Sequence, residues 1–567
     1  MPLLELNNLC VDFTTENGIV HAVNGISFIL NKGKTIGIVG ESGSGKSVTS
    51  LALMGLLPKG ISKITQGNAL FNTDKETVDL FSLSEKKLCR FRGNNIAMIF
   101  QEPMTSLNPV YKCGRQVVEA IQIHDKLDKK SARQKALHWF SEVQLPDPEK
   151  AFNSYPHELS GGQRQRVMIA MAMSCNPDLL IADEPTTALD VTVQKNILDL
   201  MKRLQQKYGM SIIFISHDLG VIAEIADKVI VMYRGDVVEQ GDVADIFKNP
   251  QHAYTKGLLA CRPGLDVRLQ SLPTVDQFLK NEGPVNHEIV SRNDRIKSHE
   301  ELYKKSPLLE VQGLKTYFSL HKGLFASEER KFKAVDNVSL KLFPGETLGL
   351  VGESGCGKTT LGRTIIKLIE PTEGRIIFWG KDISKYSRHK MRELRKDMQF
   401  IFQDPYSSLN PRITVGKAIA EAMRTHKIGE NAKERRDLTF ALLKEVNLDE
   451  SYFDRYPHEL SGGQRQRICI ARALALKPKF VICDESVSAL DVSVQAQVLN
   501  LLNRLKKEFQ FSIIFISHDM SVVKYMADRM MVMRNGKIVE YGDPDDICLA
   551  PATEYTRQLL NSIPKGL

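Results

Sequence analysis

The sequence predicts an α/β protein built from two tandem copies of one unit, each with a sheet-based and a helical part. Three observations lead to this prediction. The 567 residues exceed what one core holds, and at roughly 150 residues per domain they make about four folding units. Long motifs recur in the same order in both halves. Within each half, short aliphatic runs alternate with longer amphipathic segments, which is typical of a sheet covered by helices.

The repeat is carried by four blocks of sequence. Each returns with little or no change: Ile36–Ser47 as Leu348–Thr359, Tyr155–Arg166 as Tyr456–Arg467, Ile181–Gln194 as Ile482–Gln495, and Ile212–Asp218 as Ile513–Asp519. The offset is 312 residues for the first block and 301 for the others, so insertions and deletions fall early in each copy, as loops on a common scaffold do.

These repeats predict three regions, residues 1–260, 261–306 and 307–567. The middle region is polar and charged and contains three prolines, so we interpret it as a connector. Its end, KSHEELYKKS, is consistent with a short helix whose charges are solvated. The stretches Val110–Leu145 and Ile413–Leu448 lack strand signals and predict the helical part of each copy.

Composition excludes several classes of protein. No stretch approaches the roughly 18 apolar residues of a membrane helix, and the start MPLLELNNL does not resemble a secretion signal, so any membrane connection is expected to be peripheral. Nine scattered cysteines form no C-x-x-C pair, which predicts free thiols and no metal cluster. The net charge of +9 fits a solvated basic surface, with nucleotide binding or an anionic membrane face as alternatives.

Two glycine-rich loops match G-x-x-x-x-G-K-[ST], each between an aliphatic run and a helical pattern. They consist of Gly40, Glu41, Ser42, Gly43, Ser44, Gly45, Lys46 and Ser47, and of Gly352, Glu353, Ser354, Gly355, Cys356, Gly357, Lys358 and Thr359. In such a loop the backbone N–H groups surround phosphate oxygens, the lysine reaches the β- and γ-phosphates, and the final hydroxyl binds Mg²⁺. The sequence therefore predicts two sites for a nucleoside triphosphate.

An acidic pair ends an aliphatic run in each copy: Asp183–Glu184 and Asp484–Glu485. An aspartate at the carboxyl end of a strand, beside a phosphate loop, suits Mg²⁺ binding. The glutamate that follows can polarise the attacking water. Alone, such a pair would be a solvated loop; the repeated context favours hydrolysis.

The chain resembles the ATP-binding-cassette ATPases at LSGGQ, the signature of that family. The matching residues are Ser160, Gly161, Gly162 and Gln163 in the first copy and Ser461, Gly462, Gly463 and Gln464 in the second. The resemblance covers nearly the whole chain outside the connector. It implies two P-loop NTPase cassettes, each with a RecA-like α/β subdomain and a helical subdomain, that use ATP and Mg²⁺.

Further residues take their expected roles from this resemblance. Gln101 and Gln403 are similar to the switch glutamines that touch Mg²⁺, and His217 and His518 to the histidines that contact the γ-phosphate. The segments Ala188–Asp190 and Ala489–Asp491 are similar to the interdomain aspartate loops.

The family places an adenine-stacking aromatic at the position of Phe13 and Phe318, and stacking suits the π-face of the base. A ring that merely belongs to the core is the alternative, and the neighbouring Tyr317 adds a second aromatic.

The resemblance also implies that the cassettes pair head to tail around two ATP molecules. The first site would join Gly40–Ser47 with Ser461–Gln464, and the second Gly352–Thr359 with Ser160–Gln163. Two departures concern the second copy. Ser486 stands where the family usually has proline, which stiffens the turn, so the two sites are expected to differ somewhat in rate. Cys356 replaces Ser44 and is expected to react at the mouth of its loop.

Within the family, several segments resemble the ATPases of peptide, dipeptide, glutathione and nickel importers. They are QEPMTSLNP at 101–109, QDPYSSLNP at 403–411, and the tails HAYTKGLLACRPG at 252–264 and EYTRQLLNSIP at 554–564.

The subfamily resemblance implies a peripheral subunit on the cytoplasmic face of the bacterial inner membrane. Its partners would be two integral-membrane permease subunits and, through the complex, an external solute-binding protein, with no nucleic acid. The alternative is a tandem-cassette translation factor that acts on ribosomes; such factors usually have a longer, strongly basic connector. DNA-repair relatives need zinc cysteines or coiled-coil insertions, which the sequence lacks.

Overall fold

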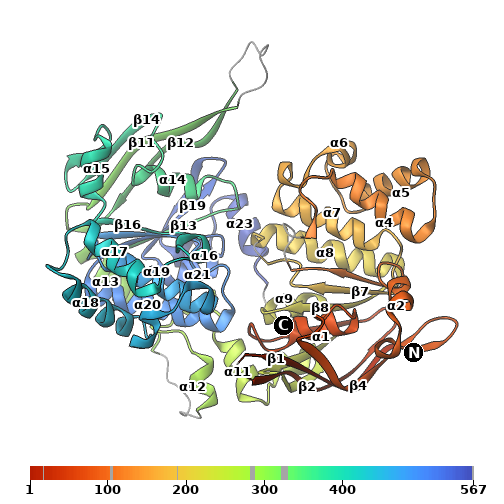
Figure 1. The fold of residues 1–567 in the computed structure, drawn as a ribbon. Coiled ribbons are helices and arrows are strands. Elements are labelled where there is room, and N and C mark those ends of the chain that lie inside the picture. The colour runs from red at the N-terminus through yellow and green to blue at the C-terminus, as the bar shows by residue number, and fades with distance from the viewer. Residues whose placement is uncertain (17, 102–105, 188, 281–287, 321–329, 565–567) are drawn as a thin grey trace.

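The computed structural model describes residues 1–16, 18–101, 106–187, 189–280, 288–320 and 330–564. Ala188, residues 102–105 of the QEPMTSLNP segment and Pro284 of the connector lie outside them. The two copies form two lobes side by side, the first in red to yellow and the second in green to blue (Figure 1). The structure therefore has the tandem α/β architecture that the repeats predict.

Each lobe contains a four-stranded antiparallel sheet and a six-stranded, mostly parallel sheet. In the first copy the antiparallel sheet has the order β2-β1-β4-β5 and the other sheet β10-β9-β3-β8-β7-β6. The strands are β1 (Pro2–Thr15), β2 (Gly18–Asn31), β3 (Thr35–Val39), β4 (Ser62–Asn72), β5 (Thr77–Asp79), β6 (Ile96–Ile99), β7 (Leu179–Asp183), β8 (Ser211–Ser216), β9 (Lys228–Tyr233) and β10 (Asp236–Asp242).

The parallel strands β3, β7 and β8 are buried along their whole length, which explains why they read as aliphatic runs in the sequence. Their register brings their carboxyl ends to one edge of the sheet, where Val39 pairs with Ser216 and Asp183 with Ile215. Ligands of open α/β sheets bind at this edge, so the sheet itself gathers the candidate residues.

The helical stretch predicted at Val110–Leu145 contains α4 and α5, and the helical part of the first copy continues beyond it through α6 and α7. The helices of the first copy are α1 (Lys46–Leu53), α2 (Glu85–Phe91), α4 (Cys113–Asp125), α5 (Lys129–Glu142), α6 (Pro148–Asn153), α7 (Gly161–Met173), α8 (Val191–Tyr208), α9 (Leu219–Ile225), α10 (Val243–Lys248) and α11 (Ala253–Ala260), with 3₁₀ turns at Leu80–Ser82 and Pro156–Glu158. Trp139 and Phe140 of α5 are buried and anchor this part.

The second copy repeats this plan, with the sheets β12-β11-β14-β15 and β16-β17-β18-β13-β19-β20. Its strands are β11 (Leu309–Leu320), β12 (Arg330–Leu342), β13 (Thr347–Val351), β14 (Glu373–Phe378), β15 (Lys381–Asp382), β16 (Met398–Ile401), β17 (Phe480–Asp484), β18 (Ser512–Ser517), β19 (Arg529–Arg534) and β20 (Lys537–Gly542). Its helices are α14 (Lys358–Ile365), α15 (Arg388–Leu394), α16 (Pro405–Ser408), α17 (Val415–Thr425), α18 (Ala432–Glu445), α19 (Gly462–Leu474), α20 (Val492–Phe509), α21 (Met520–Met526), α22 (Pro544–Leu549) and α23 (Glu554–Asn561), with 3₁₀ turns at Glu450–Asp454 and Pro457–Glu459.

The connector contains α12 (Val275–Leu279) and α13 (Arg292–Tyr303), and α13 docks on the second lobe. Arg295 is buried and pairs with Asp543 and Asp545, and His299 lies 3.6 Å from Asp528. The lysines and glutamates of KSHEELYKKS are exposed, as the sequence predicts, whereas the ring of His299 packs against the second lobe beside Asp528. Sequence alone could not show this, because the acidic partners lie more than 200 residues away.

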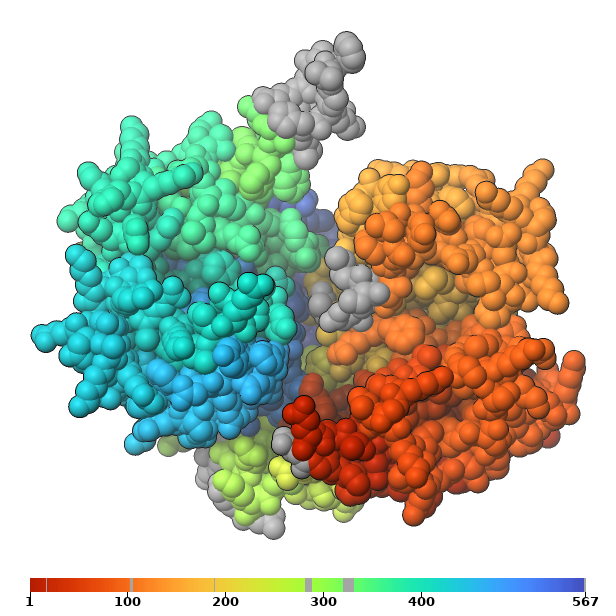
Figure 2. Space-filling model, in the orientation of Figure 1, coloured from red at the N-terminus to blue at the C-terminus, as the bar shows by residue number. Residues whose placement is uncertain are grey.

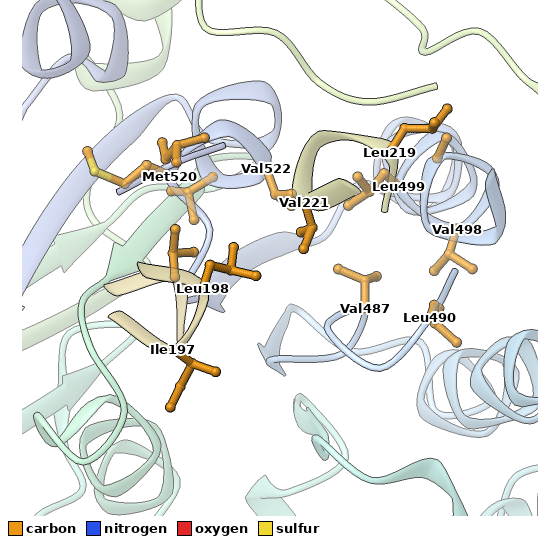
Figure 3. Packing of buried hydrophobic residues seen from close by; sticks show 14 of the residues in the cluster. Ile197, Leu198, Leu219, Val221, Val487, Leu490, Val498, Leu499, Met520 and Val522 are labelled. Atoms are coloured by element: carbon orange, nitrogen blue, oxygen red, sulfur yellow. The ribbon is translucent and has the colours of Figure 1, made fainter. Parts of the chain in front are cut away.

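One hydrophobic cluster runs through both lobes. Figure 3 shows part of it, with α8 and α9 of the first copy beside residues of the second, such as Val487, Leu490 and Val522. In the space-filling view a hollow separates the upper parts of the lobes, while their lower parts meet (Figure 2). The lobes are thus joined by a shared apolar core as well as by the connector.

Candidate functional site

Each phosphate loop links a buried strand to the start of a helix. The first runs from β3 into α1, whose first residue is Lys46, and the second from β13 into α14, which starts at Lys358. Gly45 has φ 99°, a conformation that glycine adopts readily. At Gly40 a Cβ atom would lie 2.2 Å from the carbonyl oxygen of Met232, so the loop can pass only without a side chain there. The backbone thus curls around a helix N-terminus, an arrangement that binds phosphate.

The two lysines point back into their loops. Nζ of Lys46 donates hydrogen bonds to the carbonyl oxygens of Gly40 (2.7 Å) and Glu41 (2.8 Å). Lys358 makes the equivalent bonds to Gly352 (2.7 Å) and Glu353 (2.9 Å). Both side chains are buried, and this burial lowers the pKa of Lys46 despite nearby carboxylates.

A hydroxyl and a carboxylate meet at the end of each loop. Ser47 Oγ donates to Asp183 Oδ1 at 3.1 Å, and Thr359 Oγ1 to Asp484 Oδ1 at 2.9 Å. Burial raises the pKa of Asp183 to about 6 and also raises that of Asp484, whose Oδ2 is buried without a hydrogen-bond partner. An all-oxygen set with an unsatisfied carboxylate oxygen fits a hard divalent cation such as Mg²⁺.

The first candidate hydrolytic glutamate is held by three side chains. Oε2 of Glu184 accepts hydrogen bonds from Gln101 Nε2 (3.1 Å) and Thr187 Oγ1 (2.8 Å) and lies 3.3 Å from His217 Nδ1. Burial disfavours the charged form of Glu184. The hydrogen bond and charge of His217, the hydrogen bond of Thr187 and the charge of Lys46 outweigh burial and lower the pKa of Glu184 to about 2. Glu184 is therefore a carboxylate at neutral pH.

The second glutamate has a similar but looser set of partners. Glu485 accepts from Gln403 Nε2 at 2.8 Å and lies 3.6 Å from both Lys358 Nζ and His518 Nδ1. Ser488, at the position of Thr187, donates to the backbone oxygen of Glu485 instead of its carboxylate. Despite burial, the pKa of Glu485 is lowered by His518 and Lys358.

The glutamates share one strained backbone conformation, with φ 46° at Glu184 and 45° at Glu485. Pro185 follows the first and Ser486 the second. The φ angle of the glutamate is thus nearly the same whether proline or serine follows it.

Residues of the second copy reach the first phosphate loop. The backbone N–H and the hydroxyl of Ser42 both donate to the Asp491 carboxylate at 3.1 Å, and the hydroxyl of Ser493 donates to Glu41. Burial raises the pKa of Glu41. The structure therefore brings the candidate interdomain aspartate Asp491 to the loop of the opposite cassette.

The two signatures stay within their own copies. Ser160 and Ser461 begin α7 and α19, and their hydroxyls accept from the backbone N–H of Gln163 and Gln464 at 3.3 Å. Across the described ranges, no hydrogen bond joins either signature to a phosphate loop.

The signature glycines have a packing role. A Cβ at Gly162 would lie 2.7 Å from the side chain of Val193, and one at Gly463 would lie 2.3 Å from that of Val494. Only glycine therefore lets each signature helix approach the helix after the aspartate loop so closely.

The two candidate adenine-stacking rings differ in exposure. Phe13 is partly buried against the core of the first antiparallel sheet, whereas Phe318 is 40% exposed on β11. Tyr317 donates from its hydroxyl to Asp336 at 2.6 Å. Phe318 is thus free to stack on a ligand, and Phe13 also serves the core.

The expectation of a reactive thiol at the second loop is not supported by the geometry. Cys356 is buried, and its Sγ would lie 2.8 Å from a Cβ placed on Gly352, so it fills the inside of the loop. Burial raises the pKa of Cys356, which opposes formation of a reactive thiolate.

Two tyrosines at the phosphate loops were missed in the sequence. The hydroxyl of Tyr254 accepts from the backbone N–H of Glu41 at 2.9 Å, and that of Tyr555 from Glu353 at 3.0 Å. The signal was present, because the Tyr-Thr pairs at 254–255 and 555–556 stand 301 residues apart, like three of the four repeated blocks.

Two family models match this chain. A model described as "ABC transporter" matches residues 23–187 and 335–488, more than half of the chain. A second, "Oligopeptide/dipeptide transporter, C-terminal region", matches 238–283 and 539–566. No described helix is both long and apolar enough to span a bilayer.

The chain is similar over nearly its whole length to proteins named "Glutathione import ATP-binding protein GsiA". The protein of Pectobacterium atrosepticum is 47% identical over 565 residues, that of Salmonella typhimurium 48% over 564 and that of Escherichia coli O6:H1 47% over 572. In each case 99% of this chain and 89% of the relative are covered.

A solved structure, a dimeric ATP-binding cassette in a post-hydrolysis state bound to ADP and Pi, covers 42% of this chain and 98% of its own at 26% identity and TM-score 0.38. From the family match and the full-length relatives, the chain belongs to the ABC transporter family and is an ATP-hydrolysing subunit with two ATP-binding cassettes.

Proposed function

We propose that this chain powers the import of glutathione or a similar short peptide. The similarity to glutathione import ATP-binding proteins over 99% of the chain carries this proposal. The match of both tails to the C-terminal region of oligopeptide and dipeptide transporters supports it, and none of the reported relatives favours the ribosomal alternative. Two membrane permease subunits and an external solute-binding protein would complete the importer at the cytoplasmic face of the inner membrane.

Residues 1–260 and 307–567 would be the two cassettes and 261–306 their connector. In each cassette, Lys46 or Lys358 and the loop N–H groups would bind the phosphates. Mg²⁺, which neutralises phosphate charge when bound, would be held in the first copy by Ser47, Asp183 and Gln101. The equivalent residues of the second copy are Thr359, Asp484 and Gln403.

Hydrolysis would depend on the carboxylates of Glu184 and Glu485, each of which orients a water toward the γ-phosphate. Their ionisation at neutral pH suits this role. His217 and His518, which lie beside them, would contact the γ-phosphate, and Phe13 and Phe318 would stack on adenine. The crossed bonds of Asp491 to Ser42 support sites shared between the cassettes, with Ser461–Gln464 completing the first and Ser160–Gln163 the second.

Uptake of radiolabelled glutathione by cells that lack this chain tests the proposal. Re-expression of the wild type should restore uptake, whereas a chain with Glu184→Gln and Glu485→Gln should not. A labelled dipeptide and a labelled nickel salt are the matched cargo controls. Restored uptake of only nickel would contradict a peptide-like cargo.

A further inference from the structure

A tyrosine from each tail supports the phosphate loop of its own cassette. Tyr254 lies in α11 and Tyr555 in α23, and both rings are buried. Their hydroxyls accept the hydrogen bonds from Glu41 and Glu353 described above. The arrangement occurs twice, once in each copy, so it belongs to the repeated design of the cassette.

The peptide that each tyrosine holds is also held by the loop lysine. The N–H of Glu41 and the carbonyl of Gly40 belong to one planar peptide group. Tyr254 binds the N–H end, and Lys46 donates to the carbonyl end at 2.7 Å. Rotation of this peptide away from the tyrosine would therefore move the acceptor of the lysine. In the second copy Tyr555 and Lys358 hold the equivalent peptide in the same way.

Each ring is fixed by the strand next to the phosphate-loop strand. Tyr254 packs on Tyr233, at the end of β9, with ring centroids 4.4 Å apart. Tyr555 lies under the guanidinium of Arg534, at the end of β19, at 4.7 Å. Each tyrosine ring thus packs between its own tail helix and the end of a strand of the parallel sheet.

Each tail also contacts the opposite cassette. Lys195 of α8 donates to the carbonyl oxygen of Asn561 at the end of α23, at 2.7 Å. In the other direction, the contact is made by the connector that continues the first tail: the side-chain amide of Asn500 in α20 bonds the backbone N–H and carbonyl of Leu272 at 2.9 and 2.8 Å. Helices α8 and α20 begin directly after the candidate interdomain aspartates Asp190 and Asp491.

We propose that Tyr254 and Tyr555 are positioning residues that fix the peptide under each phosphate-loop lysine, and that each tail thereby couples its loop to the opposite cassette. This rests on the proposed phosphate-binding role of Lys46 and Lys358. The tyrosines touch the loop backbone and act on ATP only through the lysines.

The test compares Tyr254→Phe and Tyr555→Phe in the full-length chain, since phenylalanine keeps the ring and removes only the hydroxyl. Each variant should raise the KM for Mg-ATP about fivefold, the size of one hydrogen bond, with kcat within about twofold. The melting temperature should fall by only about 2–4 °C, the effect of losing one hydrogen bond. The control is Tyr233→Phe, which removes a hydroxyl from the ring packed against Tyr254 and should leave KM unchanged.

Labelling with photoreactive ATP resolves the two sites: Tyr254→Phe should reduce labelling of the first loop and Tyr555→Phe that of the second. Wild-type KM in both variants would overturn the proposal, and so would an equal rise of KM in Tyr233→Phe. Lys46→Ala separates this failure from failure of the proposed site. If Lys46→Ala abolishes labelling of the first loop while both tyrosine variants behave as wild type, only the positioning role is refuted.

Discussion

Asp190 and Asp491 occupy equivalent positions in the two cassettes but use their carboxylates differently. Asp190 accepts from the backbone N–H of Val193 at 2.9 Å and so caps its own helix, α8. Asp491 makes no such cap and accepts both hydrogen bonds of Ser42, from the opposite cassette. The first site thus has a cross-cassette contact for which the described part of the second loop has no counterpart. Identical motifs therefore do not give identical sites, because the packing around each residue decides which hydrogen-bond partners lie within its reach.

A second difference concerns the hydrolytic glutamates. Thr187 donates to the carboxylate of Glu184, whereas Ser488 donates to the backbone of Glu485. The carboxylate of Glu184 is thus fixed by one more hydroxyl. Together with the Asp491 contact, this makes the first site the more constrained of the two.

The largest expected effect comes from the glutamates. Glu184→Gln and Glu485→Gln should each lower ATP turnover about 100-fold or more, the usual size of acid–base assistance, while ATP still binds. Steady-state hydrolysis and equilibrium binding of ATP measure the two quantities. Wild-type turnover in either variant would show that its glutamate does not serve hydrolysis.

Substitutions in the two signatures should affect ATP binding at the two sites separately. If Ser461–Gln464 completes the site of Lys46, then Ser461→Arg places a bulky side chain against the γ-phosphate and should abolish ATP trapping there. Trapping at Lys358 should persist, and Ser160→Arg should show the converse. Photoreactive ATP with peptide mapping measures both. Loss at Lys358 alone would mean that each cassette uses its own signature.

Substitution of Asp190 and Asp491 tests the difference between the two ATP sites directly. Asp491→Ala removes two hydrogen bonds to the first loop and should lower the ATP affinity of that site about tenfold. Asp190→Ala, the matched variant, should affect nucleotide binding less and should instead destabilise α8 by about 1 kcal/mol through loss of a cap. Site-resolved ATP titration and thermal unfolding measure these effects. Equal losses of affinity would indicate that the crossed contact of Asp491 adds nothing.

Adenine stacking predicts a smaller effect. Phe318→Ala should weaken ATP affinity about fivefold, since stacking of a base on an aromatic ring contributes about 1 kcal/mol or more. Because Phe318 is 40% exposed, its removal should leave the melting temperature unchanged, whereas Phe13→Ala should also lower it. Unchanged affinity in both variants would make the rings structural.

The smallest effect is one of stability and depends on pH. Asp528 is covered by the connector, and despite burial its pKa is held well below the ordinary value by Lys506 and His299. An ionised carboxylate of lowered pKa stabilises the fold above its unfolded pKa of about 4 and loses this effect as the pH falls. Asp528→Asn should therefore lower the melting temperature by about 2–4 °C at pH 7 and by less at pH 4.

Asp227 is the matched position in the first cassette, where it pairs with Lys34 on the surface. Because exposed pairs contribute little, Asp227→Asn should change the melting temperature less. A larger shift for Asp227→Asn would contradict the stabilising role assigned to the docked connector.

The sequence by itself determined the repeated architecture and its chemical centre. Glycines that no other residue can replace, such as Gly40, and fully buried parallel strands leave patterns that depend only on neighbours along the chain. The pairing of Ser47 with Asp183 also followed, since strands of one sheet end at one edge.

Contacts between residues far apart in the chain were decided only by the tertiary structure. Three hydrogen bonds join residues that lie 200 or more positions apart: Asp491 with Ser42, Tyr254 with Glu41, and Arg295 with Asp543. A carboxylate or hydroxyl can bond whatever donor or acceptor lies near it, so its residue type does not name its partner. The packing of the two cassettes determines that partner, and for this reason two nearly identical motifs have different hydrogen-bond partners.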